Sequence, residues 1–111
     1  MSNLADQHCA PCEGGTKPMD AETAKVHIKQ LSSKWQLADD ANSITGEFEF
    51  KNYYRTTAFV NAVAWIAHSE DHHPDITFGY KNCSIFFTTH AIDGLSGNDF
   101  ISAAKIDRLV D

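Results

Sequence analysis

Two adjacent histidines, His72 and His73, stand between an acidic residue, Asp71, and Pro74, and a third histidine, His90, ends the apolar run NCSIFFTT. Imidazole titrates near neutral pH, so a group of histidines suits general acid and general base chemistry. The proline would stiffen the chain and fix where the two adjacent rings point. The sequence therefore predicts proton transfer at this stretch, provided that the fold brings the third histidine to the other two.

A β-hairpin is the element that would bring these histidines together. Two short apolar segments flank residues 81–82, which we interpret as a two-residue turn. The resulting register pairs Ile76 with Phe87 and leaves one face of the hairpin apolar or aromatic. Continued toward the open end, the same register places His73 opposite His90, with Cβ atoms roughly 5 Å apart.

Two other interpretations of the histidines stay open. They could be surface residues at the C-terminal end of a helix, where a cation is favourable. They could also bind a metal, and His68 and His72 have the i, i+4 spacing that suits zinc on a helix. However, Pro74 ends that helix close by, and adjacent histidines on a strand point to opposite faces. We therefore expect no metal here.

The motif HCAPC at residues 8–12 contains half of the ligands of a zinc knuckle. A structural zinc needs four ligands, and no second cysteine pair follows. A redox Cys-x-x-Cys motif would need a neighbouring βαβ unit, which the chain does not predict. We expect residues 1–18, which are polar and contain Gly14-Gly15, to form a flexible N-terminal arm.

The apolar periodicity predicts one α+β domain over residues 19–111. Helical patterns run over about 20–32, 53–70 and 98–110, and strand patterns lie near residues 35–37, 44–50, 75–80 and 83–88. The order α-β-β-α-β-β-α predicts an antiparallel four-stranded sheet with three helices on one face.

Charge and composition exclude several classes of partner. The 111 residues carry a net charge of -6, which argues against nucleic acid because phosphate binding needs clustered Lys and Arg. No apolar run approaches the roughly 20 residues that span a membrane. The start lacks the features of a signal peptide, and the cysteine count of three is odd. We expect a cytoplasmic protein with reduced thiols.

From His68 onward, the sequence closely resembles the pterin-4a-carbinolamine dehydratases. The resemblance rests on the joint spacing of AHSEDHHP, TTH at 88–90 and GLSGNDF at 94–100, and it covers about residues 19 to 110. It implies the α+β fold expected above, assembled as a homodimer or homotetramer. It also implies dehydration of 4a-hydroxytetrahydropterin to quinonoid dihydropterin, without metal or organic cofactor, in pterin recycling for an aromatic amino acid hydroxylase.

The resemblance further implies residue roles. His72 and His90 would be general acids, and His73 would contact the pterin beside them. Asp99 would orient His90 without contacting the pterin itself. Position 68 is His where many members of the family have Glu, and an imidazole cannot make the same contact to a pterin amide. The substrate-binding residues would be His68, Asp71, Pro74, Thr88 and Thr89.

Two further functions remain open from the sequence. Some similar proteins bind a transcription factor and stabilise its dimer, so a non-catalytic partner-binding module is one alternative. Binding of a different pterin, such as a molybdenum-cofactor precursor, is the other.

Overall fold

The computed structural model describes residues 4–10 and 17–110 of the chain. Within them, three α-helices and four strands follow the predicted order, and short 3-10 turns lie at Leu4–Asp6 and His90–Ile92. The elements are α1 (Ala21–Ile28), β1 (Trp35–Leu37), β2 (Ile44–Glu49), α2 (Tyr53–Glu70), β3 (Asp75–Phe78), β4 (Asn82–Phe87) and α3 (Gly97–Leu109). The α+β prediction is confirmed, although α1 ends about a turn earlier than its pattern predicted.

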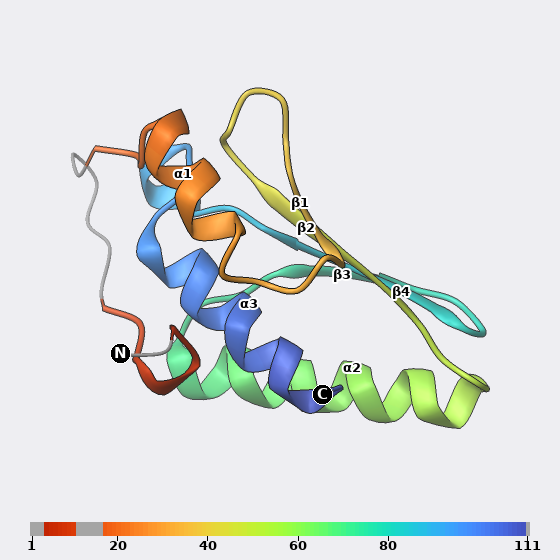
Figure 1. Cartoon of the computed structure of the whole chain (residues 1–111). Coiled ribbons are helices and arrows are strands. Elements are labelled where there is room, and N and C mark those ends of the chain that lie inside the picture. The colour runs from red at the N-terminus through yellow and green to blue at the C-terminus, as the bar shows by residue number, and fades with distance from the viewer. Residues whose placement is uncertain (1–3, 11–16, 111) are drawn as a thin grey trace.

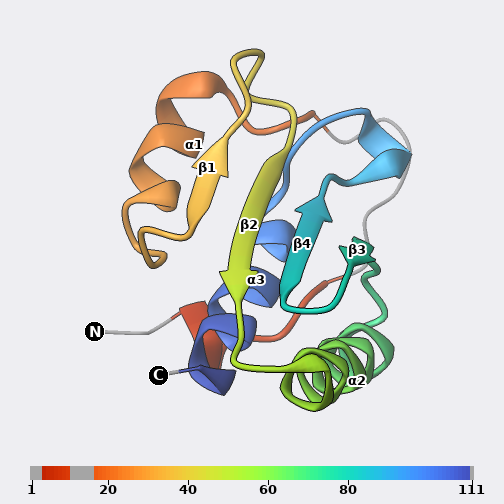
Figure 2. The same cartoon turned by 90° about the vertical axis from the view of Figure 1, so that its right-hand side faces the viewer.

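All neighbouring strands are antiparallel, in the order β1-β2-β4-β3. Figure 1 shows α1 and α3 on one side of the sheet, and Figures 1 and 2 both show α2 at one end of it. The helices and the inner face of the sheet enclose the core. Its most deeply buried large side chains are Ile44, Ile85, Phe87, Val63, Leu95, Phe100 and Ile106.

The alternating pattern of β2 explains the inner face of the sheet. Ile44 and Phe48 are buried, whereas Glu47 and Glu49 on the other face are exposed. Gly46 shares the buried face, and a Cβ built there would lie 2.9 Å from the indole ring of Trp35. The glycine therefore lets the Trp35 ring lie directly on the neighbouring strand.

The hairpin formed by β3 and β4 differs from the predicted register by two residues. Ile76 pairs with Ile85 rather than with Phe87, and the turn is centred on residues 80–81. A shift of two residues leaves the same side chains on the same face, so the apolar pattern could not distinguish the two registers. Phe87 is therefore buried as expected, but Phe78 near the turn is 42% exposed.

The described part of the N-terminal segment, residues 4–10, packs against α3, which the prediction of a flexible arm did not anticipate. Leu4 and Ala5 are buried, and the Nζ of Lys105 donates to the carbonyl of Ala5 at 2.9 Å. Arg108 pairs with Asp6 at 2.8 Å. Among the helices that the structure describes, none has the length and apolar character needed to span a membrane.

Candidate active site

A cavity of about 320 Å³ lies between the C-terminal end of α2 and the segment that joins β4 to α3. This volume is within the range of small-molecule sites. Six of the predicted site residues line it, together with three that were not predicted. The predicted ones are Asp71, His72, His73, Thr88, Thr89 and His90, and the others are Ala10, Ala91 and Asn98.

The three histidines converge by a different route from the predicted one. β3 begins at Asp75 and β4 ends at Phe87, so His73 and His90 lie outside the strand ladder and do not oppose each other in it. The C-terminal end of α2 positions His72 and His73 instead. Asp71 adopts a left-handed conformation, with φ 52°, and terminates the helix, so that the chain turns toward the cavity.

His72 is the most constrained of the three. Its Nε2 lies 2.6 Å from Oδ1 of Asp99, and its ring stacks on Phe87 with the planes 4° apart. The side chain of Asp99 is completely buried. Asp99 was predicted to orient His90, and the structure corrects this, because the histidine that it contacts is His72.

Asp99 is itself fixed by two further donors. Its Oδ2 accepts a hydrogen bond from the Thr89 hydroxyl at 2.8 Å and another from the Ser96 backbone N–H at 3.1 Å. The second bond is half of a capping box at the start of α3, in which the Ser96 side chain also accepts from the helix backbone. The carboxylate that holds His72 is therefore part of the helix cap, and its position is set by the fold.

The remaining predicted residues fall into two groups. His73 and His90 are exposed at the cavity, and the Thr88 hydroxyl donates to the carbonyl of Asn42 at 2.7 Å. His68 and Pro74 do not line the cavity. His68 is exposed on α2, where its ring lies 5.7 Å from that of Trp65.

Two polar residues that sequence reasoning missed hold the N-terminal segment beside the cavity. Oε1 of Glu70 accepts the Cys9 backbone N–H at 2.7 Å, and its Oε2 lies 3.0 Å from Nδ1 of His8. Asn98 exchanges two hydrogen bonds with the backbone of Ala10. No periodicity or motif links a segment this short to residues so far along the chain.

Burial and hydrogen bonding set the ionisation of these groups. Burial alone would raise the pKa of Glu70, but the hydrogen bonds from Cys9 and His8 and the charge of Lys105 outweigh it and lower that pKa. Burial raises the pKa of the Cys9 thiol to about 11. Cys9 is consequently a neutral thiol at physiological pH.

Of the HCAPC motif, His8, Cys9 and Ala10 lie within the described residues, whereas Cys12 lies outside them. The described part of the chain contains no group of three or more His, Cys, Asp or Glu side chains that could hold a metal ion. Cys9 instead lies 3.4 Å from the hydroxyl of Ser102.

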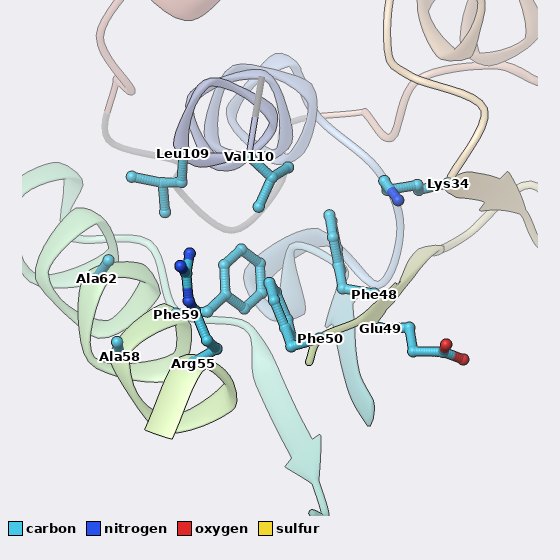
Figure 3. Close-up of a pocket in the computed structure, with 10 residues that line it drawn as sticks. All are labelled: Lys34, Phe48, Glu49, Phe50, Arg55, Ala58, Phe59, Ala62, Leu109 and Val110. Atoms are coloured by element: carbon cyan, nitrogen blue, oxygen red, sulfur yellow. The ribbon is translucent and has the colours of Figure 1, made fainter. Parts of the chain in front are cut away.

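A second cavity, of about 590 Å³, lies between the start of α2, the end of β2 and the end of α3. Its lining is largely apolar and aromatic, with Phe50, Phe59 and Leu109 prominent, and Figure 3 shows Arg55 reaching over Phe59 while Glu49 points away. It contains no histidine or cysteine. The smaller cavity is therefore the one that gathers histidines, which titrate near neutral pH.

Comparison with known proteins gives a consistent result. Residues 17–109 match the family model described as Pterin 4 alpha carbinolamine dehydratase. A protein of Nitrosomonas eutropha named "Putative pterin-4-alpha-carbinolamine dehydratase" is 59% identical, covering 99% of this chain and 96% of its own. A relative of the same name from Legionella pneumophila (strain Corby) is 50% identical over 98% of this chain and 96% of its own.

Solved structures share the fold. A transcriptional coactivator/pterin dehydratase from Brucella melitensis superposes with a TM-score of 0.80 at 24% identity, covering 86% of this chain and 100% of that one. A pterin dehydratase-like protein identified as a RuBisCO assembly factor in the alpha-carboxysome superposes with a TM-score of 0.59 at 25% identity, covering 68% of this chain and 88% of that one. On the extent of the family match and the identity to its relatives, this chain belongs to the pterin-4-alpha-carbinolamine dehydratase family.

Proposed function

We propose that this protein is a hydro-lyase that converts 4a-hydroxytetrahydropterin, the pterin-4a-carbinolamine, to quinonoid dihydropterin. The observation that carries the proposal is the His72–Asp99 pair, which lies beside His73 and His90 on one cavity. Family membership supports the same reaction. In pterin recycling, a separate two-electron reduction would convert this product to the tetrahydropterin that an aromatic amino acid hydroxylase uses in the cytoplasm, and the dehydratase would act as a homodimer or homotetramer.

The reaction needs an acid and a base. The C4a–O bond breaks as a general acid protonates the leaving hydroxyl, which departs as water. The neighbouring ring nitrogen loses its proton to a general base, and a C=N bond forms. Each positioned proton transfer typically contributes about 10²–10⁴-fold to the rate.

The geometry suggests how the histidines divide this work. Asp99 at Nε2 fixes the orientation of the His72 ring and stabilises the imidazolium that forms when the ring takes up a proton. The other ring nitrogen, Nδ1, then remains to exchange a proton with the substrate. We assign general acid and base roles to His72 and His90, and pterin contacts to His73 and Asp71.

The direct test is the dehydration rate of synthetic 4a-hydroxytetrahydropterin, followed by ultraviolet absorbance with and without a chelator. We expect a rate well above the spontaneous one and insensitive to the chelator. A rate equal to the spontaneous one would reject the proposed activity.

A second candidate is a partner-binding role. One structural relative is described as a RuBisCO assembly factor, which shows that this fold can serve assembly. In this chain, Tyr54 is 82% exposed and Trp65 is 68% exposed on α2, which leaves aromatic surface for a partner. If the chain forms complexes only with itself and turns over the carbinolamine, this candidate fails.

A further inference from the structure

The N-terminal segment of residues 4–10, which we call the arm, forms part of the histidine cavity. Figure 1 shows it in red beside α3 and the C-terminal end of α2. Its last described residue, Ala10, lines the cavity together with His72, His73 and His90. The arm contributes no acid or base to the cavity, because His8 faces Glu70 instead.

The hydrogen bonds that hold the end of the arm come from two side chains with little exposure. Glu70, whose side chain is 7% exposed, accepts the Cys9 backbone N–H at 2.7 Å. Asn98 donates to the Ala10 carbonyl at 2.6 Å and accepts the Ala10 N–H at 3.0 Å. This reciprocal pair fixes both backbone groups of Ala10, as a neighbouring strand would.

The two halves of the arm bury different amounts of surface. Leu4 and Ala5 are buried and join the core, whereas His8 and Ala10 are exposed. Cys9 is partly buried and packs against the core, so core packing accounts for the first half of the arm and for Cys9 but not for Ala10. The end of the arm is held by polar contacts, and its Ala10 is where the arm meets the cavity.

Both side chains that hold the arm are chain neighbours of the proton-transfer pair. Glu70 lies two residues before His72, and Asn98 directly precedes Asp99. We propose that the docked arm is a wall of the pterin pocket, and that Glu70 is the positioning residue that holds this wall against the site. This rests on the proposed function, because it names a determinant of how that site binds its substrate.

A wall without catalytic groups acts on substrate binding and leaves the chemical step alone. Ordering the wall before the substrate arrives lowers the cost of binding. Loosening the arm should therefore raise KM, and should also raise the Kd for an oxidised, fluorescent pterin. The value of kcat should stay close to that of the wild type.

The first variant is Glu70→Ala, with Glu22→Ala as the matched control on the exposed surface of α1. Hydrogen exchange read by mass spectrometry reports whether the Cys9 and Ala10 amides have been released. In Glu70→Ala we expect faster exchange in residues 4–10, a rise in KM and pterin Kd of about tenfold, and kcat within about twofold of the wild type. The control should match the wild type in all three.

The second variant is Ala10→Leu, which keeps the backbone contacts of the arm and adds bulk at the cavity. Ala21→Leu, at an exposed position of α1, is its control. For Ala10→Leu we expect unchanged amide hydrogen exchange in the arm but a higher KM and a higher pterin Kd. The Ala21→Leu control should match the wild type in all three. If Glu70→Ala fails to fold, this variant still tests the wall. If Glu70→Ala folds but does not release the arm, Glu70 is rejected as the residue that holds the wall, and Ala10→Leu then tests the wall alone.

The possible outcomes distinguish a failure of the proposed wall from a failure of the proposed reaction. If the wild type turns over the carbinolamine but Ala10→Leu, or a Glu70→Ala protein with a released arm, keeps wild-type KM and Kd, the wall is rejected and the dehydratase stands. If the wild type binds pterin without turnover and Ala10→Leu weakens that binding, the wall stands and the reaction fails. A wild type that neither binds pterin nor dehydrates the carbinolamine rejects both.

Discussion

The buried carboxylate of Asp99 lies 2.6 Å from Nε2 of His72, and its second oxygen accepts the Thr89 hydroxyl at 2.8 Å. One side chain thus joins the end of α2, the end of the β4 segment and the cap of α3. A histidine that is held in this way keeps one ring orientation without help from the substrate.

Replacing Asp99 should therefore damage catalysis more than folding. Asp99→Asn keeps the size of the side chain but removes the charge that supports the His72 imidazolium. We expect kcat to fall by roughly 10²-fold or more, since general acid–base catalysis is worth about that much. Steady-state kinetics measure the loss, and Asp107→Asn, at another carboxylate of the same helix, is the control. An Asp99→Asn enzyme with wild-type kcat would contradict the role of the pair.

Two of the cysteine thiols should be slow to alkylate. Burial raises the pKa of Cys9 and of Cys83 to about 11 each, so little thiolate is present at pH 8. Iodoacetamide labelling with peptide mass mapping should show slower modification of both thiols in the folded protein than in urea. Labelling of Cys83 in the folded protein at the denatured rate would be inconsistent with its burial.

Docking of the arm should weaken in acid. The folded-state pKa of Glu70 is lowered from 4.5, so its stabilising contribution is present above pH 4.5 and is lost as the pH falls through the lowered value. His8, the Cys9 N–H and Lys105 are the groups that face its carboxylate. Urea unfolding of the wild type and of Glu70→Gln should differ at pH 7, and the difference should shrink as the pH falls below 4.5. A difference that does not shrink would assign the effect to other groups.

The close packing of Trp35 on Gly46 predicts a loss of stability that does not depend on the candidate active site. Gly46→Ala places a Cβ 2.9 Å from the indole ring, so the ring or the strand must shift. Overpacking of this kind costs about 1–3 kcal/mol in the free energy of unfolding. Gly97→Ala is the control, because nothing lies within 4 Å of a Cβ at that position. Chemical denaturation gives the free energy of unfolding of both variants. Equal values for the two would contradict the close contact between Gly46 and Trp35.

The sequence predicts the elements of this fold because their hydrophobic periods are clear. The alternation in β2 and the helical spacing in α2 each bury one face, and Pro74 predicts that the helix ends shortly before it, as α2 does at Glu70. The hairpin register was wrong because a shift of two residues keeps every side chain on its face. Phe78 is exposed because β3 is an edge strand, a position that pattern alone does not reveal.

The site was only partly predictable for a different reason. His72, His73 and His90 could be grouped because one hairpin separates them along the chain. The partner of Asp99 could not be chosen, because His72 and His90 both lie near the start of α3 and only the three-dimensional arrangement distinguishes them. The contacts of Glu70 and Asn98 with the arm join distant segments through backbone groups, which every sequence possesses.

The proposed reaction depends on histidines of one cavity that transfer the protons of carbinolamine dehydration. Its most direct test is the turnover of synthetic 4a-hydroxytetrahydropterin by a His72→Ala/His90→Ala double variant, with His68→Ala as the control outside the cavity. Circular dichroism and thermal unfolding establish that each protein is folded. We predict that the double variant falls to the spontaneous rate and that His68→Ala retains most of its kcat. A folded double variant with wild-type turnover would contradict the assignment.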